Sequence, residues 1–183
     1  MLIADQKKYT VEDYLMLEEG VPFQLINYDL ITSPSPLSIH QQVLYALSEI
    51  IVLYNIKHGR QGQWLYAPMD VKFDDGNVVQ PDILYIAEDR KKELIKHRIE
   101  GAPDLIIEIL SPSNAYYDLR QKKDVYEKYG VKEYIIIDPI QQNADLYALK
   151  SGVYVLAQKV QLTETLKSVL LPVFDIEVST LFK

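Results

Sequence analysis

The sequence has 183 residues, the length of one domain of ordinary size. Its 48% hydrophobic and 25% charged residues are typical of a globular protein and exclude a disordered or collagen-like chain. Cysteine is absent, which excludes disulfides, cysteine-ligated zinc, iron–sulfur clusters and thiol nucleophiles. Any bound metal would therefore be held by oxygen or histidine ligands.

The formal net charge of -7 argues against broad, non-specific adhesion to nucleic acid, although it leaves room for a local basic groove. No apolar run reaches the roughly 18 residues that span a bilayer, and residues 1–8 contain no apolar leader segment. We therefore expect a cytoplasmic protein without a membrane partner. No repeat or flexible linker divides the chain, so residues 1–183 are expected to form a single domain.

In the first third of the chain, Thr10 and Asp13 form a capping-box pattern that predicts a short helix, with Gly20 as its stop. Residues 23–26 and 30–31 then predict two short strands across a turn. From Ser38 to about His58, apolar residues recur with helical spacing, which predicts the longest helix of the protein.

The middle of the chain contains two β-rich runs, residues 64–73 and 78–86, joined by a turn at residues 74–77 that indicates a hairpin. The charged residues 88–98 predict a short exposed helix. Residues 105–110 are almost continuously apolar, as expected of a central strand that is covered on both faces.

The last third begins with a second amphipathic helix, which runs to Tyr129 and ends at Gly130. A buried strand at residues 134–138 and a hairpin around residues 150–152 follow, and residues 166–182 form a weakly patterned tail. This order of elements predicts an α/β fold in which a mixed β-sheet is flanked by helices.

Three residues in this predicted fold suggest chemistry. Glu108 lies inside the apolar strand, where an ionised carboxylate is costly unless a metal or a lysine compensates its charge. Asp82 opens another apolar strand, where aspartate is disfavoured. Lys122 shares a helix face with apolar residues, including Tyr126 four positions on, and so should face the sheet, whereas Lys123 should point to solvent.

Each of these residues also has a structural interpretation. Glu108 could belong to a structural ion pair or an edge position, and Asp82 could be a strand-start or turn residue. The Lys122 stem could simply cover apolar surface. Only the three residues together favour a site.

The sequence contains motifs that resemble the Uma2 family (DUF820) of the PD-(D/E)xK nuclease superfamily. These motifs are Gln80-Pro81-Asp82, residues 103–113, Asp118, Lys122, Tyr126, Gly130-Val131, Glu133-Tyr134, residues 23–26, and residues 33–40. The resemblance extends from Thr10 to about Pro139. It implies a restriction-endonuclease-like fold and a nuclease site.

The resemblance assigns roles to the three residues. Asp82 matches the aspartate of the family's Pro-Asp motif, and Glu108 matches the acidic residue of the (D/E)xK half-motif. Leu110 stands where that motif has lysine, so the role passes to Lys122 on the following helix. Asp82, Glu108 and the backbone carbonyl of Ile109 would hold Mg²⁺, with Mn²⁺ as a substitute.

Further residues could assist this site. Gln24 replaces a glutamate that is usual in the family and would be a weaker metal ligand. His40 matches a frequent family histidine, and a capping or surface role is its alternative. Ser111 and Ser113 could donate to a phosphate or serve only loop closure and helix capping, and Asp118 could brace the helix near Lys122.

The sequence therefore leads to the hypothesis of a Mg²⁺-dependent endonuclease, with catalytic residues Asp82, Glu108 and Lys122. DNA is its expected substrate, and a homodimer is expected from the family resemblance. One alternative is a decayed member that acts as a nucleic-acid or protein interaction module, which Gln24 and the net charge of -7 favour. Another is a purely structural ion-pair network.

Overall fold

The structure is a computed structural model that describes residues 7–18, 20–33, 35–111 and 115–182, with the backbone course alone for residues 115–119. The helices are α1 (Val11–Leu15), α2 (Ser38–His58), α3 (Lys91–Leu94) and α4 (Ala115–Tyr129), with 3-10 turns η1 (Glu88–Arg90) and η2 (Val178–Phe182). The strands are β1 (Phe23–Ile26), β2 (Asp29–Thr32), β3 (Gly62–Tyr66), β4 (Val71–Asp74), β5 (Asn77–Val79), β6 (Ile83–Ala87), β7 (Ile99–Glu100), β8 (Leu105–Ile109), β9 (Glu133–Asp138), β10 (Asn143–Lys150), β11 (Val153–Gln161), β12 (Thr165–Lys167) and β13 (Asp175–Glu177).

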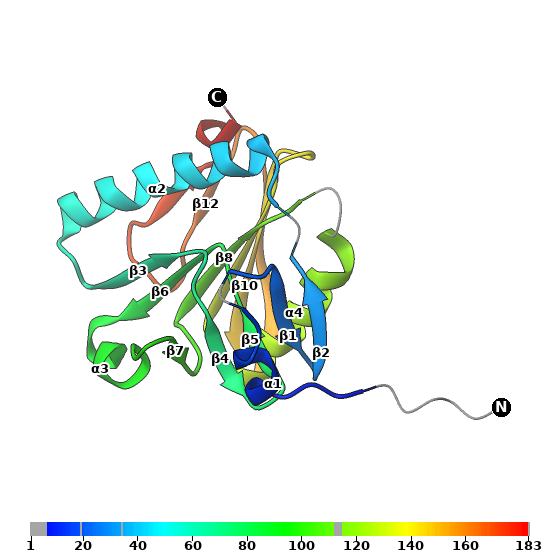
Figure 1. Cartoon of the computed structure of the whole chain (residues 1–183). Coiled ribbons are helices and arrows are strands. Elements are labelled where there is room, and N and C mark those ends of the chain that lie inside the picture. The colour runs from blue at the N-terminus through cyan, green and yellow to red at the C-terminus, as the bar shows by residue number, and fades with distance from the viewer. Residues whose placement is uncertain (1–6, 19, 34, 112–114, 183) are drawn as a thin grey trace.

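These strands form two main sheets (Figure 1). The larger has the order β11-β10-β9-β8-β6-β3, and the smaller has the order β2-β1-β5-β4-β7. In the larger sheet β8 pairs parallel with β9 and antiparallel with β6, so it is a central strand of a mixed sheet. The expected α/β fold with a mixed sheet flanked by helices is confirmed, with the strands divided between two sheets.

The short-range signals in the sequence have clear counterparts. The Thr10 hydroxyl accepts a hydrogen bond from the Asp13 N–H, and the Asp13 carboxylate accepts one from the Thr10 N–H, which completes the capping box of α1. Gly130 follows the end of α4 with φ of 86°, a conformation that glycine adopts without strain.

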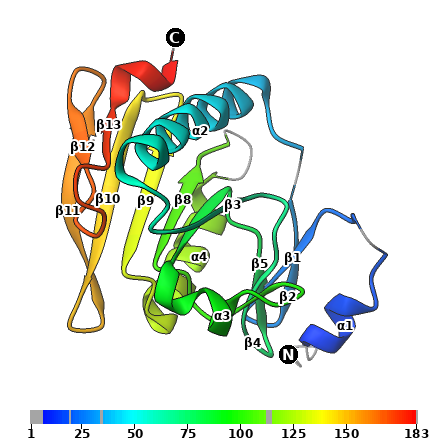
Figure 2. The same cartoon turned by 90° about the vertical axis from the view of Figure 1, so that its left-hand side faces the viewer.

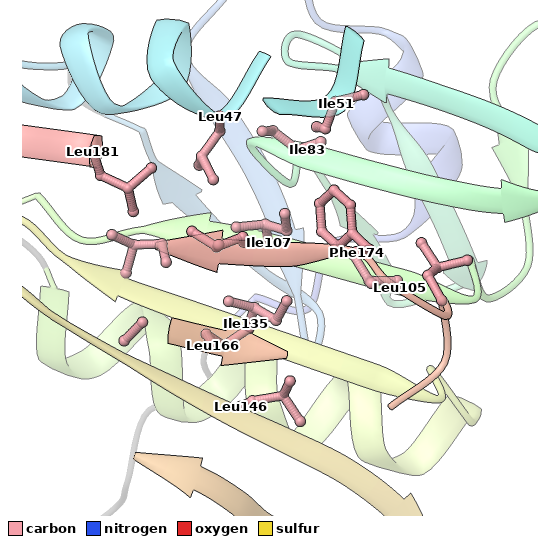
Figure 3. Packing of buried hydrophobic residues seen from close by; sticks show 14 of the residues in the cluster. Leu47, Ile51, Ile83, Leu105, Ile107, Ile135, Leu146, Leu166, Phe174 and Leu181 are labelled. Carbon is pink, nitrogen blue, oxygen red and sulfur yellow. The ribbon is translucent and has the colours of Figure 1, made fainter. Parts of the chain in front are cut away.

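Helices α2 and α4 cover opposite faces of the larger sheet. Side chains of α2 pack with Ile83, Leu105, Ile107, Ile135 and Leu146, as Figure 3 shows. Side chains of α4 pack with the alternate positions Leu84, Ile106 and Tyr134. Because successive residues of a strand point to opposite faces, Glu108 lies on the same face as Ile106, toward α4.

The structure corrects one expectation. The runs 64–73 and 78–86 are not single strands, because each is divided between the larger and the smaller sheet. The weakly patterned tail forms regular elements: β12 and β13 form a hairpin beside β11, and η2 packs against α2 (Figure 2). Its residues Leu166, Phe174, Ile176, Val178 and Leu181 belong to the core under α2.

No helix in the described part of the chain is long and apolar enough to cross a membrane.

Candidate active site

Asp82 lies where the chain passes from the smaller sheet to the larger one. Continued beyond Ile83 and Ile107, the register of β6 and β8 would pair Asp82 with Glu108 and then Pro81 with Ile109. Pro81 has no N–H to donate to Ile109, and the Ile109 N–H donates to Asp82 Oδ2 at 2.7 Å. The proline therefore ends the strand pairing, and the aspartate side chain takes the place of the next backbone partner.

Glu108 is held by two side chains from α4. Lys122 Nζ donates to Glu108 Oε1 at 3.0 Å, and the Tyr126 hydroxyl donates to the same oxygen at 2.6 Å. Lys122 and Tyr126 are four residues apart, one turn of helix, so both reach one point on the sheet. Lys122 faces the sheet as expected, whereas Lys123 lies with its Nζ 3.6 Å from the ring centre of Tyr147 rather than free in solvent.

The ionisation of Glu108 reflects opposing effects. Burial raises the pKa of its carboxyl, the charge and hydrogen bond of Lys122 lower it, Asp82 raises it, and the Tyr126 hydrogen bond lowers it. The net result is a pKa above the usual range of a glutamate. A cation between the two carboxylates would relieve both the burial of charge and the repulsion from Asp82.

His40 joins this group from the first turn of α2. Its side chain is buried, and its Nε2 lies 3.1 Å from Asp82 Oδ1. Its Nδ1 is also buried and has no hydrogen-bond partner among the described residues. The capping or surface role considered for this histidine is wrong, because it contacts an inner carboxylate of the site.

Gln24 lies in β1. Its Oε1 accepts a hydrogen bond from the Gln80 N–H at 2.9 Å, and its Nε2 donates to the Ser33 hydroxyl. The first of these bonds connects β1 to the segment that carries Asp82. The amide is buried and oriented from both ends.

One cavity of about 980 Å³ contains most of the expected site residues. Its lining includes Asp82, Glu108, Lys122, Gln24, His40, Ile109 and Ser111. Ser113 and the side chain of Asp118 lie outside the described residues. Residues from both sheets, α2 and α4 thus meet around one space.

The same cavity is also lined by Tyr14 and Asp70, which the sequence did not single out, and by Gln80 of the Gln80-Pro81-Asp82 motif. Asp70 Oδ1 accepts hydrogen bonds from the Tyr14 hydroxyl and from Gln80 Nε2, both at 2.9 Å. Arg98 also lines this cavity. Burial, together with the charge of Asp70, raises the pKa of the Tyr14 hydroxyl, so it remains a hydrogen-bond donor.

The donor set fits a hard divalent cation bound mainly by oxygen. Within the described ranges no three His, Asp or Glu side chains form a metal-holding group, so side chains alone do not complete such a site. Two mutually repelling carboxylates, Asp82 and Glu108, do line the cavity, and so does Ile109. Mg²⁺ suits such a set because it retains several waters and uses one or two carboxylates.

The fold has a known counterpart. A crystal structure of a putative nuclease belonging to DUF820 from Anabaena variabilis has a TM-score of 0.75 and 21% sequence identity, and the match covers 94% of this chain and 97% of that chain. A weaker likeness, with a TM-score of 0.41 and 11% identity, relates 69% of this chain to 14% of the type IIG restriction endonuclease BpuSI. The first of these likenesses shows that the chain shares the fold of the DUF820 structure over nearly its whole length.

Sequence comparison gives the family. The model of Uma2, described as "Putative restriction endonuclease", matches residues 11–179, and the chain belongs to this family. An uncharacterized Synechocystis protein, sll1609, is 26% identical over 156 residues, which is 80% of this chain and 84% of that protein. The family expected from the motifs is therefore confirmed.

Proposed function

We propose that this protein is a metal-dependent endonuclease that hydrolyses phosphodiester bonds of nucleic acid, with DNA as the expected substrate. The observation that carries the proposal is the meeting of Asp82, Glu108 and Lys122 in one cavity. Asp82 directly precedes β6, Glu108 lies on the adjacent strand β8, and Lys122 lies on α4. Membership of the Uma2 family supports the same reaction class.

Asp82, Glu108 and the Ile109 carbonyl would hold the metal. A bound Mg²⁺ or Mn²⁺ would stabilise the charge that develops on the phosphoryl oxygens and make a water more acidic. The Ile109 N–H and His40 fix the orientation of the Asp82 carboxylate.

Lys122 is the proton-handling group in this proposal. Its ammonium hydrogen-bonds Glu108 Oε1, and it faces the cavity in which the scissile phosphate would lie. It would orient the attacking water and offset charge at the phosphate. Tyr126 holds the same glutamate oxygen from the next turn of α4, which restrains Glu108 when Lys122 moves.

A cleavage assay tests the proposal. The wild type is incubated with Mg²⁺ or Mn²⁺ and labelled single- and double-stranded DNA, beside the variants Glu108→Gln and Glu133→Gln. Glu133 is a matched control because it is also a buried glutamate of the larger sheet but lies outside the cavity. We expect loss of cleavage for Glu108→Gln alone; cleavage that survives this change contradicts the assignment.

A second candidate is a non-cleaving module of the same fold, and Gln24 favours it. This amide stands where the family usually has a carboxylate, and both its ends are occupied by Ser33 and Gln80. Titration calorimetry distinguishes the two candidates, because the absence of Mn²⁺ binding at millimolar metal supports the module. The homodimer stays a prediction, which sedimentation of the purified protein tests.

A further inference from the structure

Arg98 lines the same cavity as Lys122. It directly precedes β7, which pairs parallel with β4, and Asp70 directly precedes β4. The Ile99 N–H donates to the Asp70 carbonyl at 2.9 Å, which fixes the backbone beside Arg98. Arg98 therefore occupies a defined place on the cavity wall.

Most of its basic neighbours in sequence are bound elsewhere. Arg90 pairs with Asp104 at 2.9 Å, Lys91 pairs with Glu88 at 3.1 Å, and Lys96 Nζ donates to the Lys92 carbonyl at 2.9 Å. Among the lysine and arginine residues between 90 and 98, Arg98 alone lines the cavity, next to His97.

The guanidinium of Arg98 is only partly satisfied. Its Nε lies 3.6 Å from Glu100 Oε1, a loose contact. Its Nη1 is buried and has no hydrogen-bond partner among the described residues. The side chain is 23% exposed and lines the cavity, so a ligand with acceptor oxygens that contacts it there would supply hydrogen bonds that the protein does not.

Lys122, the other lysine or arginine among the residues that line the cavity, is already engaged. Lys122 contacts Glu108 at 3.0 Å, and His40 contacts Asp82 at 3.1 Å. Asp70 receives two neutral hydrogen bonds from Tyr14 and Gln80, which stabilise its carboxylate without Arg98. Arg98 is thus available to an incoming anion, and a guanidinium suits phosphate because its planar fork can donate two parallel hydrogen bonds.

We propose that Arg98 binds a second phosphate of the nucleic-acid strand, a different one from the phosphate cleaved beside Lys122. This inference rests on the proposed nuclease function and specifies its substrate: a strand with at least two phosphates in the cavity. Arg98 is a substrate-binding residue in this scheme and takes no part in bond cleavage. Its loss should weaken binding of the strand and leave the chemical step unchanged.

The experiment compares two substrates that differ in their number of phosphates. A labelled oligonucleotide offers neighbouring phosphates, whereas bis(p-nitrophenyl) phosphate is a diester with only one. For Arg98→Gln we expect a rise in the oligonucleotide KM of about tenfold with kcat unchanged, and no change with the small diester. The slope of the logarithm of the oligonucleotide binding constant against the logarithm of salt concentration should also become shallower by about 1, the amount expected for the loss of one phosphate contact.

Two further variants make the result specific. Lys96→Gln removes an exposed positive charge from the same segment and should leave both substrates unaffected. Arg98→Lys retains the positive charge but loses the planar pair of guanidinium donors, and it should give an intermediate oligonucleotide KM. It also serves as the test variant if Arg98→Gln does not fold. An unchanged oligonucleotide KM, or equal losses with both substrates, would overturn the inference.

Oligonucleotide binding, measured by fluorescence anisotropy, separates this inference from the proposed function. A wild type that binds the strand without cleaving it contradicts the nuclease function, yet supports Arg98 if Arg98→Gln weakens binding. If the wild type cleaves the oligonucleotide and Arg98→Gln is fully active at substrate concentrations below KM, only the inference about Arg98 is contradicted. A wild type that neither binds nor cleaves contradicts both.

Discussion

Lys122 Nζ lies 3.0 Å from Glu108 Oε1, and the two side chains are only 8% and 6% exposed. An ion pair this deeply buried has lost most of its hydration, so each charge depends on the other for compensation. Charge in the site is therefore coupled to the stability of the sheet and of α4. A variant of either residue can lose activity because it unfolds, so activity and stability must be measured on the same variants.

Lys122→Met should reduce cleavage at least about a hundredfold, because it removes the group proposed to handle the proton. It should also lower the free energy of unfolding by about 3 kcal/mol, since Glu108 then keeps a buried charge without its partner. Urea denaturation and the cleavage assay measure the two effects.

The neighbouring Lys123→Met is the matched control, since its side chain lies over Tyr147 and outside the cavity. The double variant Lys122→Met with Glu108→Gln should recover part of the lost stability but no activity. A purely structural ion pair would instead give a destabilised Lys122→Met that still cleaves in proportion to its folded fraction.

Mn²⁺ should stabilise the wild type against heat. A ligand that binds only the folded state adds RT ln(1 + [L]/Kd), about 1.4 kcal/mol at ten times Kd, or about 4 °C for a chain of this size. Asp82→Asn should abolish most of this shift, because it removes one of the two carboxylates that line the cavity. Differential scanning fluorimetry at neutral pH measures it.

Asp145→Asn is a suitable control for the metal experiment, since Asp145 pairs with Lys159 on the β10–β11 hairpin, away from the cavity. This variant should show the same Mn²⁺-induced rise in melting temperature as the wild type. Equal shifts for the wild type and Asp82→Asn would show that Mn²⁺ binds elsewhere on the protein.

Tyr126→Phe should weaken the site without altering its shape. The Tyr126 hydroxyl lowers the pKa of Glu108, so its loss raises that pKa further above the usual range. Less Glu108 is then ionised at a given acidic pH, and the acid limb of the pH–rate profile should move to higher pH. The lost hydrogen bond to a carboxylate should reduce stability by about 2 kcal/mol.

Tyr134→Phe provides the comparison for Tyr126. Tyr134 is equally buried, and their ring centroids are 5.2 Å apart, but its hydroxyl has no hydrogen-bond partner among the described residues. Removing that hydroxyl should leave the pH–rate profile unchanged and the stability equal or slightly higher. Identical behaviour of the two variants would contradict the role assigned to the Tyr126 hydrogen bond.

Away from the site, the contribution of Glu133 to the stability of the fold should decrease as pH rises. Its Oε2 accepts the N–H groups of Val169 and Leu170, but burial still raises the pKa of its carboxyl. A raised pKa gives stability that is complete below the unfolded pKa and is lost as pH increases through the folded pKa. The free energy of unfolding of Glu133→Gln, measured by urea denaturation and compared with that of the wild type, should therefore rise by about 1 kcal/mol between pH 4 and pH 7.

Asp104 should show the opposite pH dependence. Burial alone would raise its pKa, but the Ala87 N–H, Lys132 and Arg90 outweigh burial and hold it below the usual range. The contribution of Asp104 to stability is present above its unfolded pKa and is lost as pH falls through its folded pKa. Asp104→Asn should thus lower the free energy of unfolding by roughly 2 kcal/mol at pH 7 and by less at pH 3. Parallel pH slopes for the two variants would contradict these assignments.

The sequence could predict the inner part of the site because the evidence there is local. A glutamate in an apolar strand and a lysine on the apolar face of a helix each indicate their own orientation, and they meet as expected. Tyr126 carried the same signal, since it lies one turn after Lys122, but a hydroxyl partner for Glu108 could not be separated from an ordinary core tyrosine.

The rest of the cavity wall, including Asp70 and Arg98, depends on chain crossings that local patterns do not encode. Pro81 directs the chain from one sheet to the other, so a run that resembles one strand is two. Asp70 and Arg98 become neighbours only through the parallel pairing of β4 with β7. The contacts of the tail with α2 are likewise long-range, and a weak pattern alone did not indicate them.

Gln24→Glu should tighten metal binding. The buried Gln24 side chain lines the same cavity as Asp82 and Glu108 and accepts the Gln80 N–H at 2.9 Å, a bond that a carboxylate can also accept. Ser33 can reverse its hydroxyl and donate to the second carboxylate oxygen, so the change fits without rearrangement.

A third carboxylate increases the negative charge available to a divalent cation, and the Mn²⁺ Kd should fall by about tenfold. Without metal the added charge should destabilise the fold, because it repels Asp82 and Glu108. Gln41→Glu places the same charge at an exposed position on the cavity wall and should have a much smaller effect. If calorimetry gives equal Mn²⁺ affinities for Gln24→Glu and the wild type, Gln24 does not occupy a metal-facing position, and the proposed loss of a carboxylate ligand is wrong.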